Sequence, residues 1–242
     1  MAEKKVTEAT AVETLGTEHT TTNFWDKYSK PIIYAGSAII LLIAGWYGYK
    51  SFIVEPREKE ASEMVFAAEN LFDKMAATGF NKDSVNIVIN GGDLEGNKVT
   101  GLLKVINNFG GTSAGNRAKY MTGASYLHIK EFDKAIKYLK DFEGNGASQV
   151  QSKAYLMLGH AYAEQKKTSD ALSYYKKAAG VNEKDEFFAA DALMVAAAYS
   201  DATGNSKEAI NLYKELKEKY PTNAAVQSGE IDKHLAKLGV LD

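Results

Sequence analysis

The side chains that most often perform catalysis are absent from this 242-residue sequence or scattered along it. No cysteine is present, so thiol nucleophiles, thiolate metal ligands and disulfides are excluded. The histidines lie too far apart for the i, i+4 pair of a helical metal site, and they are His19, His128, His160 and His234. No glycine-rich segment carries the lysine and flanking residues of a phosphate-binding loop. We therefore expect no enzyme activity, no metal site and no cofactor.

Composition limits the class of protein further. The net charge of −2 gives no reason to expect nucleic acid, whose binding proteins concentrate positive charge. Only three prolines occur, whereas alanine, leucine, lysine and glutamate are plentiful. Such a composition favours helices, so the elements that position any binding residues are expected to be helical.

One segment near the N-terminus has the length of a membrane span. The 19 residues from Pro31 to Tyr49, PIIYAGSAIILLIAGWYGY, carry no formal charge. At about 1.5 Å per residue a helix of this length covers roughly 28 Å, close to the hydrocarbon core of a bilayer. Aromatic residues flank both ends, where amphipathic rings favour the headgroup layer. The pattern predicts a transmembrane helix over residues 31–53, with Pro31 in its first turn and Ser29 as a possible cap.

A cleavable signal peptide and a buried soluble helix are the alternatives to this span. A signal peptide would have a shorter apolar region that ends in small residues, whereas this segment ends in the bulky Trp46-Tyr47-Gly48-Tyr49. A buried helix would need covering on all faces. The lysines and arginines on the two sides of the span are almost balanced, so they determine no orientation. We expect the short tail inside and the large domain outside.

The flanking segments are less regular. Residues 1–30 are polar and lack a helical period, which predicts a disordered tail. Residues 54–79 are expected to form a membrane-proximal helix that packs either on its own domain or on another membrane protein. Its apolar stripe consists of Met64, Ala67, Ala68, Leu71, Phe72 and Met75. Residues 80–115 are expected to be a Gly/Asn-rich loop followed by an entry helix from about Thr100 to Phe109. Thr112 or Ser113 can cap the next helix.

The C-terminal half contains an internal repeat. RAKYMTGASYLHIKEFDKAIKYLKDF begins at Arg117, and KAYLMLGHAYAEQKKTSDALSYYKKAAG begins at Lys153. The pairs that lie 36 residues apart are Gly123 with Gly159, Tyr126 with Tyr162, Ala135 with Ala171, and Leu139 with Tyr175. A third unit follows 38 residues later and contains Ala197, Gly204, Ala209, Tyr213 and, at its end, Pro221.

These positions resemble the tetratricopeptide repeat (TPR), a helical hairpin. The resemblance implies that the small residues let the two helices of a hairpin approach closely, and that Tyr126 and Tyr162 fill gaps between neighbouring hairpins. One hairpin cannot bury its own apolar face, so the hairpins must stack. We expect an all-α fold, with one N-terminal transmembrane helix followed by a TPR-type helical-hairpin solenoid. Residues 116–222 would form three TPR-like repeats, and residues 223–242 a capping helix in which Ile231, Leu235 and Leu238 face one way.

The first helix of each repeat is expected to line a groove that binds protein. By repeat register the groove residues would be Arg117, Tyr120, Ala124 and His128, then Lys153, Leu156, His160 and Glu164, then Asp191, Met194 and Asp201. The Lys, Arg and Asn cluster with which some TPR proteins hold a C-terminal carboxylate is missing. An extended or partly unfolded polypeptide, or a folded partner, therefore fits better.

The whole layout is similar to the YfgM-type ancillary subunits of the SecYEG translocon. The stretch LLKVINNFGGTSAGNRAKYMTGASYL, in which a helix leads directly into the first repeat, resembles that family as well. The resemblance implies a bacterial inner-membrane protein with a cytoplasmic N-terminus and a periplasmic TPR domain. Its implied partners are the translocon, a periplasmic chaperone of the PpiD type and exported polypeptides. Two other functions stay open, namely a scaffold subunit of another envelope complex and a cytosol-facing TPR adaptor.

Overall fold

The computed structural model describes residues 19–94 and 96–240. The chain divides into two compact units, one that ends at Pro56 and one that begins at Arg57. The predicted fold class is confirmed, because the described residues are mainly helical and only two three-residue strands occur among them.

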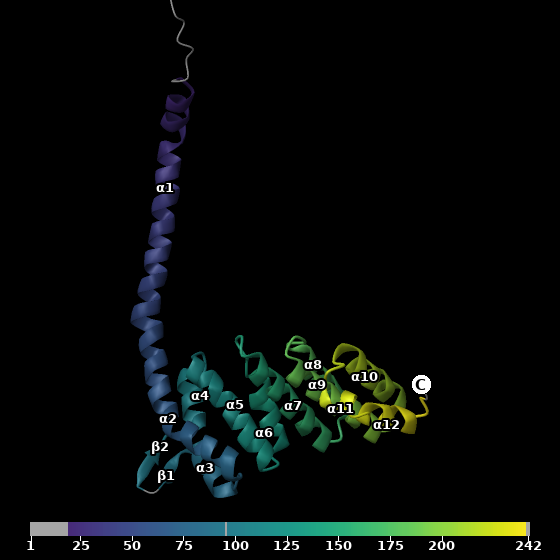
Figure 1. The fold of residues 1–242 in the computed structure, drawn as a ribbon. Helices are drawn as coiled ribbons and strands as arrows, with labels where there is room; N and C mark the ends of the chain where they lie inside the picture. Colours follow the sequence, from purple (N-terminus) through teal and green to yellow (C-terminus); the bar gives the residue numbers. More distant parts are fainter. Residues whose placement is uncertain (1–18, 95, 241–242) are drawn as a thin grey trace, which may run out of the picture. The chain divides into compact units, whose positions relative to one another are not determined.

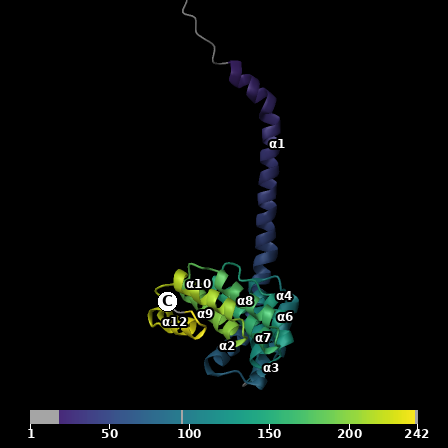
Figure 2. The ribbon, with the colours of Figure 1, turned by 90° about the vertical axis from the view of Figure 1, so that its right-hand side faces the viewer.

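The described part of the first unit is helical. Helix α1 runs from His19 to Tyr49, and the π-helix η1 continues from Lys50 to Val54 (Figures 1 and 2). Residues 19–30 are therefore helical and not a disordered tail, whereas residues 1–18 lie outside the described residues. Pro31 lies inside α1 and not in its first turn. A proline removes a single backbone N–H, and a long helix can continue through it at a cost of about 3 kcal/mol.

Helix α1 exposes its apolar residues on every side. The most apolar window of the helix has a mean hydropathy of 1.6, and none of it is buried. Four consecutive side chains, from Ile39 to Leu42, are 56–73% exposed. The helix is long and apolar enough to cross a membrane, which makes it compatible with a single-pass anchor.

The boundary between the units falls in the first turn of helix α2 (Glu55–Thr78), which is followed by a small helical and β-hairpin segment. The residues predicted as a Gly/Asn-rich loop form helix α3 (Lys82–Asn90) and the strands β1 (Gly92–Leu94) and β2 (Asn97–Val99). The strands pair antiparallel. Helix α4 (Leu102–Phe109) corresponds to the predicted entry helix.

The loop prediction was wrong because Asn and Gly serve here as caps and turn residues. The Asn81 side chain accepts a hydrogen bond from the Ser84 backbone N–H, at 2.8 Å, and so caps α3. Val85, Val88 and Ile89 are buried on one face of α3. Gly91 has a φ of +86°, the left-handed region that glycine tolerates. A polar composition therefore concealed a short amphipathic helix.

Three helical hairpins follow in order along the unit (Figure 1). Their helices are α5 (Ser113–His128) with α6 (Phe132–Lys140), α7 (Ser148–Glu164) with α8 (Thr168–Gly180), and α9 (Glu186–Ala202) with α10 (Ser206–Lys219). The Thr112 hydroxyl caps α5 by accepting from the Gly115 N–H, at 3.0 Å.

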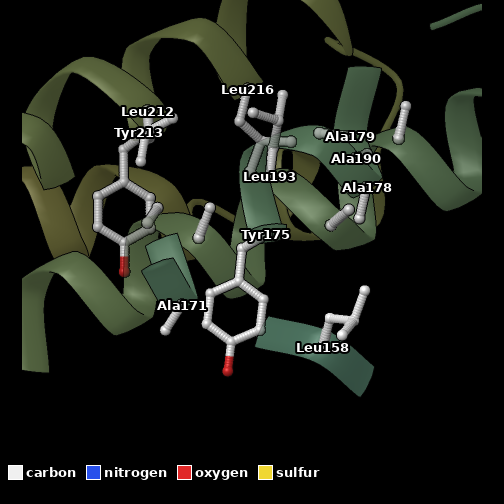
Figure 3. Packing of buried hydrophobic residues seen from close by; sticks show 14 of the residues in the cluster. Leu158, Ala171, Tyr175, Ala178, Ala179, Ala190, Leu193, Leu212, Tyr213 and Leu216 are labelled. Carbon is white, nitrogen blue, oxygen red and sulfur yellow. The ribbon is translucent and has the colours of Figure 1, made fainter. Parts of the chain in front are cut away.

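The hairpins close over a continuous core. Leu158, Tyr175, Leu193, Tyr213 and Leu216 belong to one buried cluster, which spans the second and third hairpins. Figure 3 shows Leu193 and Leu216 side by side, with the Tyr175 and Tyr213 rings and several small alanines in the same cluster. The alanines leave room for the large rings and leucines.

The C-terminal segment forms two short helices where one was predicted. Helix α11 (Ala224–Gln227) and helix α12 (Glu230–Lys237) are separated by Gly229, which has a φ of +70°. A residue in the left-handed region ends a helix, so the chain turns at Gly229. Ile231 and Leu235 are buried against the hairpin core and Leu238 is half-buried, so α12 covers the end of the hairpin array.

Candidate protein-binding face

The first helices of the hairpins form one layer of the second unit. Helix α7 contacts both α5 and α9 directly. The second helices α6, α8 and α10 contact one another less closely than the first helices do, although a Lys176–Glu208 ion pair of 2.7 Å joins α8 to α10. The closer spacing of the first helices makes their side the inner, concave one. We call it the inner face.

Helix α2 adds a further helix to the inner face. The Arg117 guanidinium pairs with the Glu69 carboxylate at 3.2 Å, and the His128 ring stacks on Phe80 at 3.8 Å between centroids. Each of these pairs joins residues 48 apart in sequence. Glu58, near the start of α2, accepts from the Ser113 N–H at the start of α5, and the later contacts follow in the same order, so α2 and α5 run parallel. The apolar stripe of α2 packs on its own domain, the first of the two alternatives.

A pocket of about 450 Å³ opens between α2, α5 and the α6–α7 connection. Its apolar side chains are Phe72, Tyr120, Met121, Phe142 and Val150, and its charged side chains are Glu69, Asp73, Arg117 and Glu143. The Tyr120 and Phe142 rings lie 5.3 Å apart. Partial burial among these neighbours raises the pKa of Tyr120, so its ring stays neutral.

The charges around the pocket do not balance. Arg117 is engaged by Glu69, whereas Asp73 and Glu143 form no ion pair within the described residues. The loop that carries Glu143 is held in place, because its backbone N–H donates to the Asn116 side chain at 3.1 Å. Two carboxylates beside an apolar floor suit a cationic side chain whose stem is apolar, such as lysine or arginine.

The middle of the inner face carries a histidine held by a tyrosine. His160 Nδ1 lies 2.9 Å from the Tyr175 hydroxyl. His160 is exposed at its surface, but partial desolvation of the imidazole lowers its pKa, although the Glu164 carboxylate opposes this shift. Burial raises the pKa of Tyr175 well above its usual value. The Tyr175 hydroxyl and His160 Nδ1 therefore share a hydrogen bond that joins α7 to α8.

All eleven residues predicted to line the groove lie on α5, α7 and α9, and ten of them, including the half-buried Asp201, are not fully buried. Of these predicted groove residues, only Arg117 and Tyr120 line the pocket. His128 lies at the far end of α5 on Phe80, and Lys153 lies over the Phe188 ring at 5.5 Å. Leu156 and Met194 are half-buried, whereas Glu164 and Asp191 are exposed. Ala124, also expected in the groove, is buried.

The repeat residues occupy close helix crossings. A Cβ atom on Gly123 would lie 2.6 Å from the Leu139 side chain, and one on Gly159 would lie 2.3 Å from the Tyr175 ring. The four small residues Ala135, Ala171, Ala197 and Ala209 are fully buried. Gly204 has a φ of +78° in its turn, and Pro221 follows the end of α10.

The two repeat tyrosines contact both their own hairpin and a neighbouring element. Within its hairpin the Tyr126 ring stacks on Tyr138 and the Tyr162 ring on Tyr174. Outside it, the Lys140 ammonium of the first hairpin lies 5.4 Å from the Tyr162 ring centroid, and Tyr126 packs against the buried cluster that contains α3.

The sequence matches the tetratricopeptide repeat family at two places, residues 152–185 and residues 191–223. The chain contains tetratricopeptide repeats. The two matches coincide with the second and third hairpins of the structure. The first hairpin and α2 lie outside both matches but continue the same inner face. No curated protein matches the sequence.

Sequence reasoning missed the contribution of α2 and of the α6–α7 connection to the pocket. Glu69, Asp73 and Glu143 lie outside the first helices of the repeats, so the repeat register assigned them no position. The 48-residue offset between α2 and α5 differs from the repeat spacing of 36.

Proposed function

We propose that this chain is a membrane-anchored protein-interaction module whose inner face holds a segment of a partner protein. TPR domains generally bind proteins, and the pocket between α2, α5 and the α6–α7 connection is the observation that carries the proposal. Its volume of about 450 Å³ accommodates one or two side chains.

The chemistry of the pocket specifies the segment. An aromatic and aliphatic floor favours an apolar side chain, because burying its surface contributes about 25 cal/mol per Å². The uncompensated Asp73 and Glu143 favour a lysine or arginine beside it. The proposed ligand is therefore an extended polypeptide segment that combines an apolar residue with a basic one.

The resemblance to YfgM-type subunits supports a more specific role. In this proposal α1 crosses the bacterial inner membrane, the N-terminus is cytoplasmic and the TPR domain is periplasmic. The domain then receives polypeptides exported through the SecYEG translocon, together with a periplasmic chaperone of the PpiD type. Exported polypeptides are unfolded when they emerge, so they present apolar and basic segments to the inner face.

Site-specific photocrosslinking in membranes tests both levels of the proposal. Photoreactive residues replace Tyr120, His160 and Met194 on the inner face, with Asn211 on α10 as an exposed control site. A separate series replaces residues of α1 from Ile39 to Gly45. The inner face is expected to capture protein and Asn211 is not.

The outcomes separate the general proposal from the specific one. If the inner face captures protein but α1 captures no translocon subunit, protein binding stands and the translocon role is rejected. The same holds if the protein captured by the inner face includes no exported polypeptide. Capture of a stable envelope partner alone would favour a scaffold. Equal capture by Tyr120 and Asn211 would contradict the whole proposal.

Orientation needs its own measurement. Because the chain has no cysteine, a single one introduced at Ser206 reports which side of the membrane the domain occupies. A membrane-impermeant maleimide added to intact spheroplasts should label this cysteine if the domain is periplasmic. Labelling only after lysis would make the chain a cytosol-facing adaptor.

A further inference from the structure

A second surface of the TPR domain combines lysines with stacked tyrosines. Five lysine ammonium groups lie 4.7–5.7 Å from tyrosine ring centroids on the first two hairpins. The rings stack in pairs, with centroids 5.8 Å and 5.4 Å apart. We call this surface the Lys–Tyr face, and it consists of Lys134, Lys137, Lys140, Lys167, Lys177, Tyr126, Tyr138, Tyr162 and Tyr174.

The Lys–Tyr face is continuous across two hairpins. Lys137 and Lys140 are one turn apart on α6, and Lys140 reaches the Tyr162 ring of the next hairpin. All five lysines are exposed. The surface therefore presents a row of ammonium groups whose apolar stems lie along aromatic rings.

Positive charge is concentrated around this face. Residues 130–140 and 166–177 together contain eight lysines and three carboxylates, a net charge of +5 in a chain whose total is −2. Within the described residues, only Lys134 and Lys176 among these lysines form an ion pair with a carboxylate. The protein itself thus leaves most of this charge uncompensated.

The hairpin fold does not require the Lys–Tyr face. In the third hairpin Ser200 and Leu212 occupy the positions of Tyr162 and Tyr174, 38 residues on. Helix α10 carries four lysines and three glutamates, so its charge almost balances. The excess of lysine and the two stacked tyrosine pairs, Tyr126–Tyr138 and Tyr162–Tyr174, are confined to α5–α8.

We propose that the Lys–Tyr face binds the anionic headgroups of the membrane in which the chain is anchored. Each lysine near an anionic bilayer surface contributes about 1 kcal/mol in general. Tyrosine rings favour the same headgroup layer, because one edge is polar and the ring is apolar. This applies to the half-buried Tyr126, Tyr138 and Tyr174, whereas the Tyr162 ring is buried and lies under the Lys140 ammonium.

The tether makes a membrane a better fit than an acidic protein. The second unit begins at Arg57, only three residues after η1 ends at Val54. With α1 in a bilayer, headgroups are always within reach of the domain, and binding becomes an intramolecular step with a high effective concentration. Weak ionic contacts are then enough to hold the face on the bilayer. A free acidic protein lacks this high effective concentration, so it would need stronger contacts to bind.

Full-length protein in lipid nanodiscs provides the test. A single cysteine at Ser173, an exposed residue beside Tyr174 on α8, carries a fluorophore that is quenched by headgroup-labelled lipid. Asn211 on α10 is the matched control, because it is exposed and occupies the same repeat position 38 residues later. The discs contain phosphatidylcholine alone or mixed with phosphatidylglycerol.

We expect quenching at position 173 to rise in the phosphatidylglycerol discs and to fall again at high salt, with little change at position 211. The triple variant Lys134→Gln/Lys137→Gln/Lys140→Gln should lower the docking equilibrium roughly a hundredfold. Circular dichroism checks that this variant is folded.

Three results would overturn the proposal. Equal quenching in neutral and anionic discs would exclude headgroup recognition. Equal quenching at positions 173 and 211 would mean that the whole domain approaches the bilayer without using this face. The face would be assigned to a protein partner if the quenching did not depend on the lipid and the domain bound an acidic polypeptide. The triple variant would then have to abolish that binding.

Discussion

The closest helix crossings depend on single glycines. Gly159 lies so near Tyr175 that an added Cβ would lie 2.3 Å from the ring. Substitution Gly159→Ala should therefore lower the free energy of unfolding by about 1–3 kcal/mol, because the tyrosine must move out of its packed position. Gly180→Ala in α8 meets nothing within 4 Å and should be neutral or slightly stabilising. Chemical denaturation of the two variants compares them directly, and equal stabilities would contradict the close crossing.

The turns inside the hairpins store a small strain at two lysines. Lys130 and Lys166 have φ values of +65° and +59°, at the repeat position where the third hairpin has Gly204. A side chain in this left-handed region costs about 1 kcal/mol. Lys166→Gly should thus raise the free energy of unfolding by roughly 0.5–1 kcal/mol, and Gly204→Ala should lower it by a similar amount. Thermal denaturation measures both changes, and a destabilised Lys166→Gly would refute the assignment.

At the scale of elements, α5 and α7 each present a histidine whose protonation opposes folding. Desolvation lowers the pKa of His128 on Phe80 and that of His160 beside Tyr175. Because the histidine pKa is lower in the folded chain than in the unfolded chain, the unfolded chain binds more protons at pH values between the two. The contribution to stability is therefore complete above the unfolded-state pKa and is lost as the pH falls from there towards the folded-state pKa. Unfolding free energies between about pH 8 and pH 5 should decrease less for His128→Gln/His160→Gln than for the wild type. Parallel pH profiles would contradict this.

The elements also differ in how far the sequence predicted them. The spacing of Gly123, Gly159 and Ala197 predicted the hairpins, because small residues at a fixed period have a direct steric meaning. Helix α3 was missed because Asn81 and Gly91 were interpreted by composition and not as a cap and a turn. The contact of α2 with α5 joins residues 48 apart outside the repeat period, so no local pattern reveals it. The pocket could not be predicted from the repeat for the same reason, because Asp73 and Glu143 lie outside the repeat helices.

At the scale of the whole molecule, the chain combines an apolar helix with a TPR domain that has two chemically different surfaces. The inner face offers apolar side chains beside uncompensated carboxylates, whereas the Lys–Tyr face offers uncompensated ammonium groups. We propose a protein segment for the first surface and anionic lipid for the second. Opposite charges on the two surfaces keep their ligands distinct.

The central claim is that the inner-face pocket holds a partner segment through apolar contact and a basic side chain. The most direct measurement is the yield of protein crosslinked from a photoreactive residue at Tyr120, with and without Asp73→Lys/Glu143→Lys. Two reversed charges beside a basic ligand each cost on the order of 1 kcal/mol or more, so we predict at least a tenfold lower yield in the variant. Circular dichroism checks that the variant is folded. An unchanged yield at Tyr120 would contradict the account.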